Sequence, residues 1–303
     1  KKLKQGLKRG IGSLTRNRLK KSRNSKKILR KVLVKKRKLK RRLKRKYLKF
    51  KNKVKKNLQK VRNNLKSSYK LKQKYGIIDV PLSETKNKGT NASSGTINYH
   101  YQLVTNINDF IYLELRGKDI HFFKNENNSI IRLNIISGGI TPLDISYLDF
   151  KSEIIRSTKR FIPLTLNIEL LTTSHANAIL IDKTKRNIEY FEPHGYKEDD
   201  STLEGLKGAY TRNSHLIKVF MKKLLPDYNF INITHSFKKV GFQMDHDARN
   251  GYCVTWSILY IHYRIINPGV PIEIIVKYIY HYVNTDKLLK YAKYIENKLK
   301  KKL

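Results

Sequence analysis

Cysteine is nearly absent from this chain of 303 residues, in which Cys253 is the single one. One cysteine forms no internal disulfide, so nothing indicates an oxidising compartment. No stretch of eighteen or more apolar residues predicts a membrane span, and no signal-peptide pattern opens the chain. We therefore expect an intracellular protein. Because residue 1 is lysine, we also expect the chain to be part of a longer translation product.

Acidic residues are missing from the first 78 positions, and the first one is Asp79. Residues 1–74 hold 35 of the 66 Lys and Arg residues. The formal net charge of the whole chain is +43, and most of it comes from this segment. The remaining residues carry 31 basic and 23 acidic side chains, which is an ordinary mixture. This contrast separates a polycationic arm, residues 1–74, from a globular part.

Apolar residues recur in the arm at helical spacing. Steps of three or four separate Leu39, Leu43, Tyr47, Phe50, Val54, Leu58, Val61 and Leu65. No proline precedes Pro81, so the pattern predicts an amphipathic helix with a cationic face. Because neutralised phosphates release counterions, we expect nonspecific, electrostatic binding of DNA or RNA through residues 1–74. Nuclear import, solubility and an anionic membrane surface are the alternatives.

Beyond the arm, the hydrophobic pattern alternates between strand and helix periods. It predicts a polar linker at 84–97, strands at 110–115, 119–123 and 129–136, a turn at 137–144 and a helix at 145–160. It then predicts a strand at 161–171, a hairpin over 175–192, a helix at 214–225 and a strand at 229–237. The segment 253–266 is apolar on every face, which predicts a buried helix, and the rest is expected to be helical.

Cys253 opens this buried helix, where the positive end of the helix dipole favours a thiolate. Attack on a carbonyl also needs a histidine and a group that orients the ring. His175 begins one hairpin strand and Glu192 ends the next, so they are expected opposite each other or one diagonal apart. Gln243 is a candidate oxyanion donor, with Asn250 as the other nearby amide. A packing role is the alternative for Cys253.

Other polar residues offer competing assignments. His194 is an alternative base, and Glu189 is an alternative orienting group of opposite strand parity to the expected partner of His175. Four further residues have a spacing that resembles metal ligands: His235, Asp245, His246 and Asp247. No cysteine pair supports them, so we expect no metal and no cofactor. Trp256 is expected to pack in the core.

The order His, acidic residue, Gln, Cys resembles the adenain-like and ubiquitin-like-protein-specific cysteine proteases (clan CE), most closely those of large DNA viruses. "HANAILIDKTKRNIEYFE" keeps the family's hairpin pattern in register at Asp182, Ile188, Tyr190 and Glu192. The likeness covers residues 160–268. It implies an α+β fold, with a central mixed sheet flanked by helices, behind the basic helical arm. It also implies a linker and accessory β-rich region at 75–160 and a catalytic domain at 161–303.

By this resemblance, His175 is the general base, Glu192 orients it and Cys253 is the nucleophile. Gln243 and the backbone N–H of Cys253 are the oxyanion donors. Three positions depart from the family: Gln243 stands ten residues before the cysteine instead of six or seven, Val254 replaces glycine, and Ala176 replaces tryptophan. The first implies an insertion, and the last implies a wider groove that is less suited to a Gly-Gly tail.

The resemblance implies a cysteine endopeptidase that cuts at small residues and processes viral precursor proteins, in a virion core or in the host cytoplasm or nucleus. Its partners would be a protein substrate and, through the arm, nucleic acid. A deubiquitinase-like or deSUMOylase-like isopeptidase is the first alternative. Acyl transfer from acetyl-coenzyme A is another. The last is a non-enzymatic, nucleic-acid-binding virion protein with a decayed protease fold.

Overall fold

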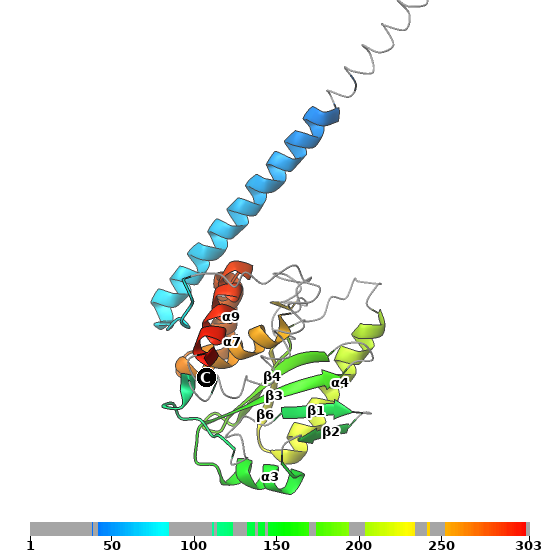
Figure 1. Cartoon of the computed structure of the whole chain (residues 1–303), viewed down its shortest axis with the longest axis vertical. Helices are drawn as coiled ribbons and strands as arrows, with labels where there is room; N and C mark the ends of the chain where they lie inside the picture. Colours follow the sequence, from blue (N-terminus) through cyan, green and yellow to red (C-terminus); the bar gives the residue numbers. More distant parts are fainter. Residues whose placement is uncertain are drawn as a thin grey trace, which may run out of the picture. The chain divides into compact units, whose positions relative to one another are not determined.

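The computed structural model describes residues 38, 42–84, 111, 114–123, 132–136, 139–142, 145–169, 174–193, 204–233, 241–242 and 252–300. The chain divides into two compact units, Lys1–Asn63 and Asn64–Leu303. In the first unit, residues 42–63 are helical, and in the second, residues 64–75 are helical (Figure 1). The helix that the apolar spacing predicts in the arm is thus present over the described residues, whereas Leu39 lies outside them.

Six strands of the second unit form one sheet in the order β2-β1-β3-β4-β5-β6. The strands are β1 (Arg132–Ile136), β2 (Gly139–Pro142), β3 (Phe161–Glu169), β4 (Ser174–Asp182), β5 (Asn187–Phe191) and β6 (Asn229–Asn232). The β1–β3 and β5–β6 pairs are parallel, and the other three pairs are antiparallel. The sheet is therefore mixed, as expected, and it includes two strands from the region before residue 160.

Helices cover both faces of this sheet (Figure 1). They are α3 (Tyr147–Arg156), α4 (Glu204–Leu224), α7 (Cys253–Ile266), α8 (Ile272–Tyr282) and α9 (Thr285–Lys300). One core cluster joins the sheet to α7, α8 and α9, and a second joins its other face to α3 and α4. Together with the mixed sheet, these helices confirm the predicted α+β class. No described helix combines the length and apolar character needed to cross a bilayer.

Three expected assignments, two strands and one turn, were wrong. Within 110–115, the described residues Ile111, Glu114 and Leu115 are helical. Ile111 and Leu115 are both buried, and residues four apart share a face of a helix, so the short apolar run fitted either period. The expected turn at 137–144 contains strand β2, because Ile136 pairs with Gly139 in a tight hairpin. Within 119–123, only Ile120 forms a bridge, with Phe161.

The β4–β5 hairpin has the turn that the sequence predicts. Asp182 pairs with Asn187, which leaves residues 183–186 as the turn, and Arg186 takes a left-handed φ of 49°. The Asp182 carboxylate accepts a hydrogen bond from the backbone N–H of Lys185 and two from the Arg160 guanidinium. One buried carboxylate thus fixes the turn and ties it to the start of β3, which sets the register of the hairpin.

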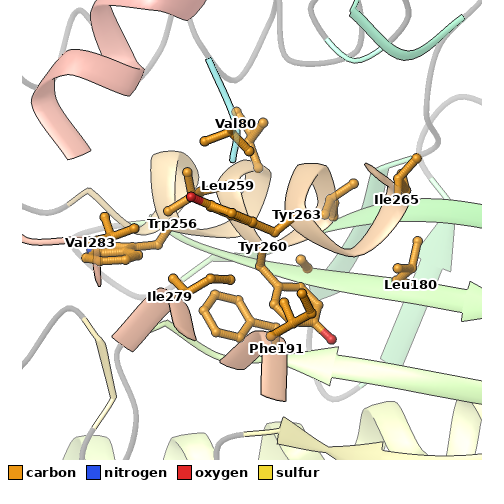
Figure 2. Packing of buried hydrophobic residues seen from close by; sticks show 14 of the residues in the cluster. Val80, Leu180, Phe191, Trp256, Leu259, Tyr260, Tyr263, Ile265, Ile279 and Val283 are labelled. Atoms are coloured by element: carbon orange, nitrogen blue, oxygen red, sulfur yellow. The ribbon is translucent and has the colours of Figure 1, made fainter. Parts of the chain in front are cut away.

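Helix α7 is buried on every side, as its uniformly apolar sequence predicts. All its residues from Cys253 to Ile265 are buried. It contacts β3 and β4 on one side and α8 and α9 on the other. Figure 2 shows Tyr260 of α7 beside Phe191 of β5, and the two rings stack 4.6 Å apart at an interplanar angle of 7°. The helix therefore has a fixed position against the two strands that carry His175 and lead to Glu192.

Residues 77–83 pack on the same helices. Ile77 and Val80 are buried in the α7 cluster, and the Asn267 side chain bonds to both backbone groups of Ile78. The Asp79 carboxylate accepts hydrogen bonds from the hydroxyls of Tyr263 and Tyr278 and from the Lys72 ammonium. Lys72 belongs to residues 1–74, which the composition assigns to the arm. The second unit begins at Asn64, so it includes the last part of that arm.

Candidate functional site

His175 and Glu192 meet at one end of the β4–β5 hairpin. His175 is the second residue of β4, and Glu192 directly follows β5. The pairing of Ala178 with Phe191, the last pair of the two strands, places Asn177 opposite Glu192 when the register is extended by one residue. His175 is then two positions further along the same face, which is the diagonal arrangement. The distance from His175 Nε2 to Glu192 Oε1 is 2.6 Å, and both side chains are buried.

Cys253 completes a line of three side chains. It is the first residue of α7, and only 8% of it is exposed. The His175 ring forms a hydrogen bond with the Cys253 side chain. Since Nε2 faces Glu192, that bond falls to Nδ1. The structure thus brings together three of the four site residues predicted from the sequence, in the order carboxylate, imidazole, thiol.

The position of Cys253 at the start of α7 places its sulfur near the positive end of the helix dipole. The helix begins there, and the preceding Tyr252 makes no side-chain capping bond. The N–H groups of the first turn point toward the N-terminal end, where the dipole is positive and favours an anion. The end of the hairpin is held close to this turn, because Ser257 Oγ donates a hydrogen bond of 3.2 Å to the carbonyl of Ala176. A thiolate and a developing oxyanion would both be stabilised there.

The charge state of His175 is set by competing effects. Burial lowers the pKa of the imidazole, but the Glu192 carboxylate and the hydrogen bonds with Cys253 and Glu192 outweigh it and raise the pKa to about 10. His175 is therefore protonated at neutral pH. An imidazolium next to a cysteine is the partner that a thiolate requires, and it can later give its proton to a leaving amine.

The alternative orienting carboxylate, Glu189, is engaged elsewhere. It lies on the opposite face of β5, fully buried, and pairs with Arg264 of α7 through two bonds of 2.8 and 2.7 Å. The Tyr260 hydroxyl donates a further bond to it. Glu189 and Glu192 therefore point to opposite faces of the strand, as their spacing predicts. Of these two carboxylates, Glu192 is the one that contacts His175.

Several predicted site residues lie outside the described part of the chain. They are Gln243, Asn250 and His194, together with the four residues of metal-like spacing, His235, Asp245, His246 and Asp247. Among the residues that are described, no group of three or more His, Cys, Asp or Glu side chains is placed to hold a metal ion. The role of Gln243 as an oxyanion donor therefore stays a prediction.

Sequence reasoning missed two buried contacts that support the site. Arg264 and Glu189 connect α7 to β5, although each interrupts an apolar segment and so signals a buried partner of opposite charge. Asn177 donates a 2.6 Å hydrogen bond to the Tyr190 hydroxyl, across the hairpin and two residues after His175. Both contacts hold the strands and the helix in the register that aligns the three side chains.

Comparisons with known proteins give few matches. No family model matches the chain. A "Putative ankyrin repeat protein" of Acanthamoeba polyphaga mimivirus is 27% identical over 139 residues, which is 41% of this chain and 18% of that protein. The chain thus spans less than a fifth of the length of this curated relative.

Two solved structures resemble the chain weakly. The Chlamydia trachomatis effector protein ChlaDUB1 has a TM-score of 0.29 and 14% identity, covering 52% of this chain and 64% of that one. The SUMO protease Ulp1, with its catalytic cysteine oxidised to a sulfenic acid, has a TM-score of 0.23 and 12% identity, covering 69% of this chain and 100% of that one.

Proposed function

We propose that this protein is a cysteine endopeptidase with Cys253 as nucleophile, His175 as proton carrier and Glu192 as the residue that positions the ring. The observation that carries the proposal is the line of three buried side chains: a 2.6 Å contact between His175 and Glu192, and a hydrogen bond between His175 and Cys253. This arrangement supports the proposal, because nucleophilic catalysis needs a histidine within reach of the thiol and a third group that orients the ring.

In the first half of the reaction, the Cys253 thiolate attacks the carbonyl carbon of the scissile peptide bond. The negative charge moves to the carbonyl oxygen, where the backbone N–H of Cys253 and the amide of Gln243 are the proposed donors. The intermediate then collapses and the C–N bond breaks. The His175 imidazolium gives its proton to the departing amine, which leaves an acyl group on Cys253 as a thioester.

In the second half, neutral His175 takes a proton from a water molecule while the water oxygen attacks the thioester. The C–S bond breaks, the carboxylic product departs, and the thiolate–imidazolium pair is restored. Glu192 stays ionised throughout and favours the protonated ring. No cofactor is required by this sequence of steps.

The substrate that we propose is an internal peptide bond flanked by small residues, in viral precursor proteins. Its support is Ala176, which follows the proposed base and carries a single methyl group, so that nothing bulky extends from this position. An isopeptidase acting on ubiquitin-like proteins is the second candidate. Direct competition between a ubiquitin-like fusion and a peptide library separates the two, and efficient cleavage of the fusion alone would favour the second.

For the arm, we propose nonspecific, electrostatic binding of DNA or RNA by residues 1–74, and a virion core or the host cytoplasm or nucleus as the location. The support is charge: the arm has 35 basic residues and no acidic one. If the protease-like site were inactive, a nucleic-acid-binding virion protein would be the remaining candidate.

Labelling of the single thiol tests the proposed chemistry. Iodoacetamide at neutral pH is expected to alkylate Cys253 in the folded protein faster than a free cysteine in a peptide, because the His175 imidazolium forms a hydrogen bond with the sulfur and can assist its attack. The control is the His175→Ala variant, which should label much more slowly. A native thiol that reacts only after unfolding would favour a packing role for Cys253. Mass spectrometry of new termini in candidate precursor proteins then identifies the cleaved bond.

A further inference from the structure

Helix 42–63 exposes large apolar side chains that have no partner within the described part of its unit. The exposed ones are Leu43, Tyr47, Leu48, Phe50, Val54, Leu58 and Val61. Their exposed fractions range from 39% for Val54 to 65% for Phe50. All but Leu48 follow one another at steps of four, three, four, four and three, so they share one face of the helix, which we call the apolar stripe.

Cations border the apolar stripe on both sides. Lys46, Lys53 and Lys60 follow one border, and Lys44, Lys51 and Arg62 follow the other. Residues 42–63 include no acidic side chain. A surface that covers this helix must therefore offer an apolar phase in the middle and negative charge along both sides.

We propose that helix 42–63 binds along the surface of an anionic lipid bilayer. The apolar stripe would enter the boundary between headgroups and acyl chains, and the bordering lysines would extend to the lipid phosphates. At a rise of about 1.5 Å per residue, the stripe from Leu43 to Val61 is about 27 Å long. It lies in the plane of the membrane and does not span it.

Charge argues against a second copy of the chain as the occupant. Paired helices place their border residues opposite each other, and here both borders of both copies would be cationic. The spacing also differs from the heptad repeat of a left-handed coiled coil. Leu43 and Val54 are eleven residues apart, which corresponds to about 3.67 residues per turn, close to the α-helical period. The stripe thus keeps nearly one direction along a straight helix, which suits a flat surface.

Nucleic acid would bind the cations of helix 42–63 but would not cover its apolar stripe. Phosphates neutralise the lysines, but they leave the apolar stripe in water. The 20 basic residues among positions 1–41 offer cations to nucleic acid outside this helix, so the two partners address different segments.

Vesicle flotation of the full chain tests the proposal. Vesicles of phosphatidylcholine with about 30% phosphatidylserine are expected to carry the protein upward, whereas pure phosphatidylcholine vesicles bind it at least tenfold less. The double variant Phe50→Ser/Leu58→Ser should lower binding to the anionic vesicles at least tenfold. Its matched control, Asn52→Ser/Gln59→Ser on the opposite face, should stay within about twofold. Circular dichroism confirms that both variants keep the parent's helix content.

Two further measurements distinguish the occupants. With Phe50→Trp, anionic vesicles should shift the emission to shorter wavelength, measured against the parent, in which Trp256 is buried. Affinity for duplex DNA should be the same in the stripe variant and its control. The proposal is overturned if the parent does not float with anionic vesicles, or if the stripe variant loses DNA affinity as strongly as the vesicle affinity. It is also overturned if that variant converts a dimer to a monomer in sedimentation.

Discussion

Helix 42–63 and the sheet with the candidate site use charged side chains in opposite ways. Around the sheet, Arg264 faces Glu189, Arg160 faces Asp182, and His175 faces Glu192. In helix 42–63, the cations have no acidic residue on the same helix, and the chain has none before Asp79. Charges of the core therefore find their partners inside the fold, whereas those of the helix remain available for an external anion.

This difference predicts unequal consequences of removing a charge. A buried ion that loses its partner keeps its desolvation cost without compensation. Removing an exposed lysine leaves no buried charge without a partner, because water solvated the lysine in the folded protein. Substitutions around the sheet should therefore change stability and chemistry, and equivalent substitutions in helix 42–63 should change only binding.

The largest effect is expected at the proposed nucleophile and base. Cys253→Ala and His175→Ala should each lower kcat for peptide hydrolysis by about 10⁵ to 10⁶, because such groups act as a unit. Lys44→Ala in the arm is the control and should leave hydrolysis of a short peptide unchanged. Measured turnover by Cys253→Ala equal to that of the parent would end the proposed mechanism.

Glu192→Gln should be less severe, with a loss of about 10⁴ in kcat. The carboxylate raises the pKa of His175, so its removal lowers that pKa and the protonated ring is lost at a lower pH. The fold favours the protonated ring, so this stabilisation is complete below a pH of about 6.5 and disappears as the pH rises through about 10. The alkaline limb of kcat/KM should thus lie near pH 10 in the parent and more than one unit lower in the variant. An unshifted limb would refute the assignment.

Arg264→Met should destabilise the protein by about 3–5 kcal/mol, because Glu189 would remain buried and unpaired. Removing all three polar groups, with Glu189→Leu, Arg264→Met and Tyr260→Phe, should recover most of this loss. Arg45→Met in the arm is the matched control. Urea unfolding measures all three variants, and equal stability of Arg264→Met and Arg45→Met would contradict the contrast between the two regions.

The smallest effect concerns the boundary of the arm. Deleting residues 1–63 should leave the melting temperature and short-peptide hydrolysis unchanged. Deleting residues 1–74 should cost about 1–2 kcal/mol, since it removes Lys72, which contacts Asp79, and Leu71, which packs on the α7 cluster. Both truncated proteins should lose most of their affinity for DNA at low salt. Unchanged duplex binding after truncation would refute the role of the arm.

Local patterns made the hairpin predictable. The alternation along residues 175–182, the polar turn after Asp182 and the fixed distance from His175 to Glu192 all lie within one short segment. The buried helix that starts at Cys253 was equally clear, because an uninterrupted apolar run needs neighbours on every side. The catalytic roles of these residues remain predictions.

Contacts between segments that are distant in the chain could not be predicted from the sequence. Glu189 and Arg264 are 75 residues apart, and no periodicity specifies which opposite charge a buried ion will meet. The short strand β2 was mistaken for a turn, because its glycine and proline suppress the strand signal although pairing with β1 supplies its hydrogen bonds. The run at 110–115 was too short to separate a helix from a strand.

The separation of Cys253 from the hairpin also sets an order of events during protein synthesis. His175 and Glu192 leave the ribosome together, whereas the thiol follows 61 residues later. At about 5–20 residues per second, the hairpin precedes the thiol by several seconds. Every nascent chain therefore passes through a stage in which its basic segment has been synthesised and the proposed nucleophile has not. The proposed cleavage therefore cannot begin before Cys253 has been synthesised.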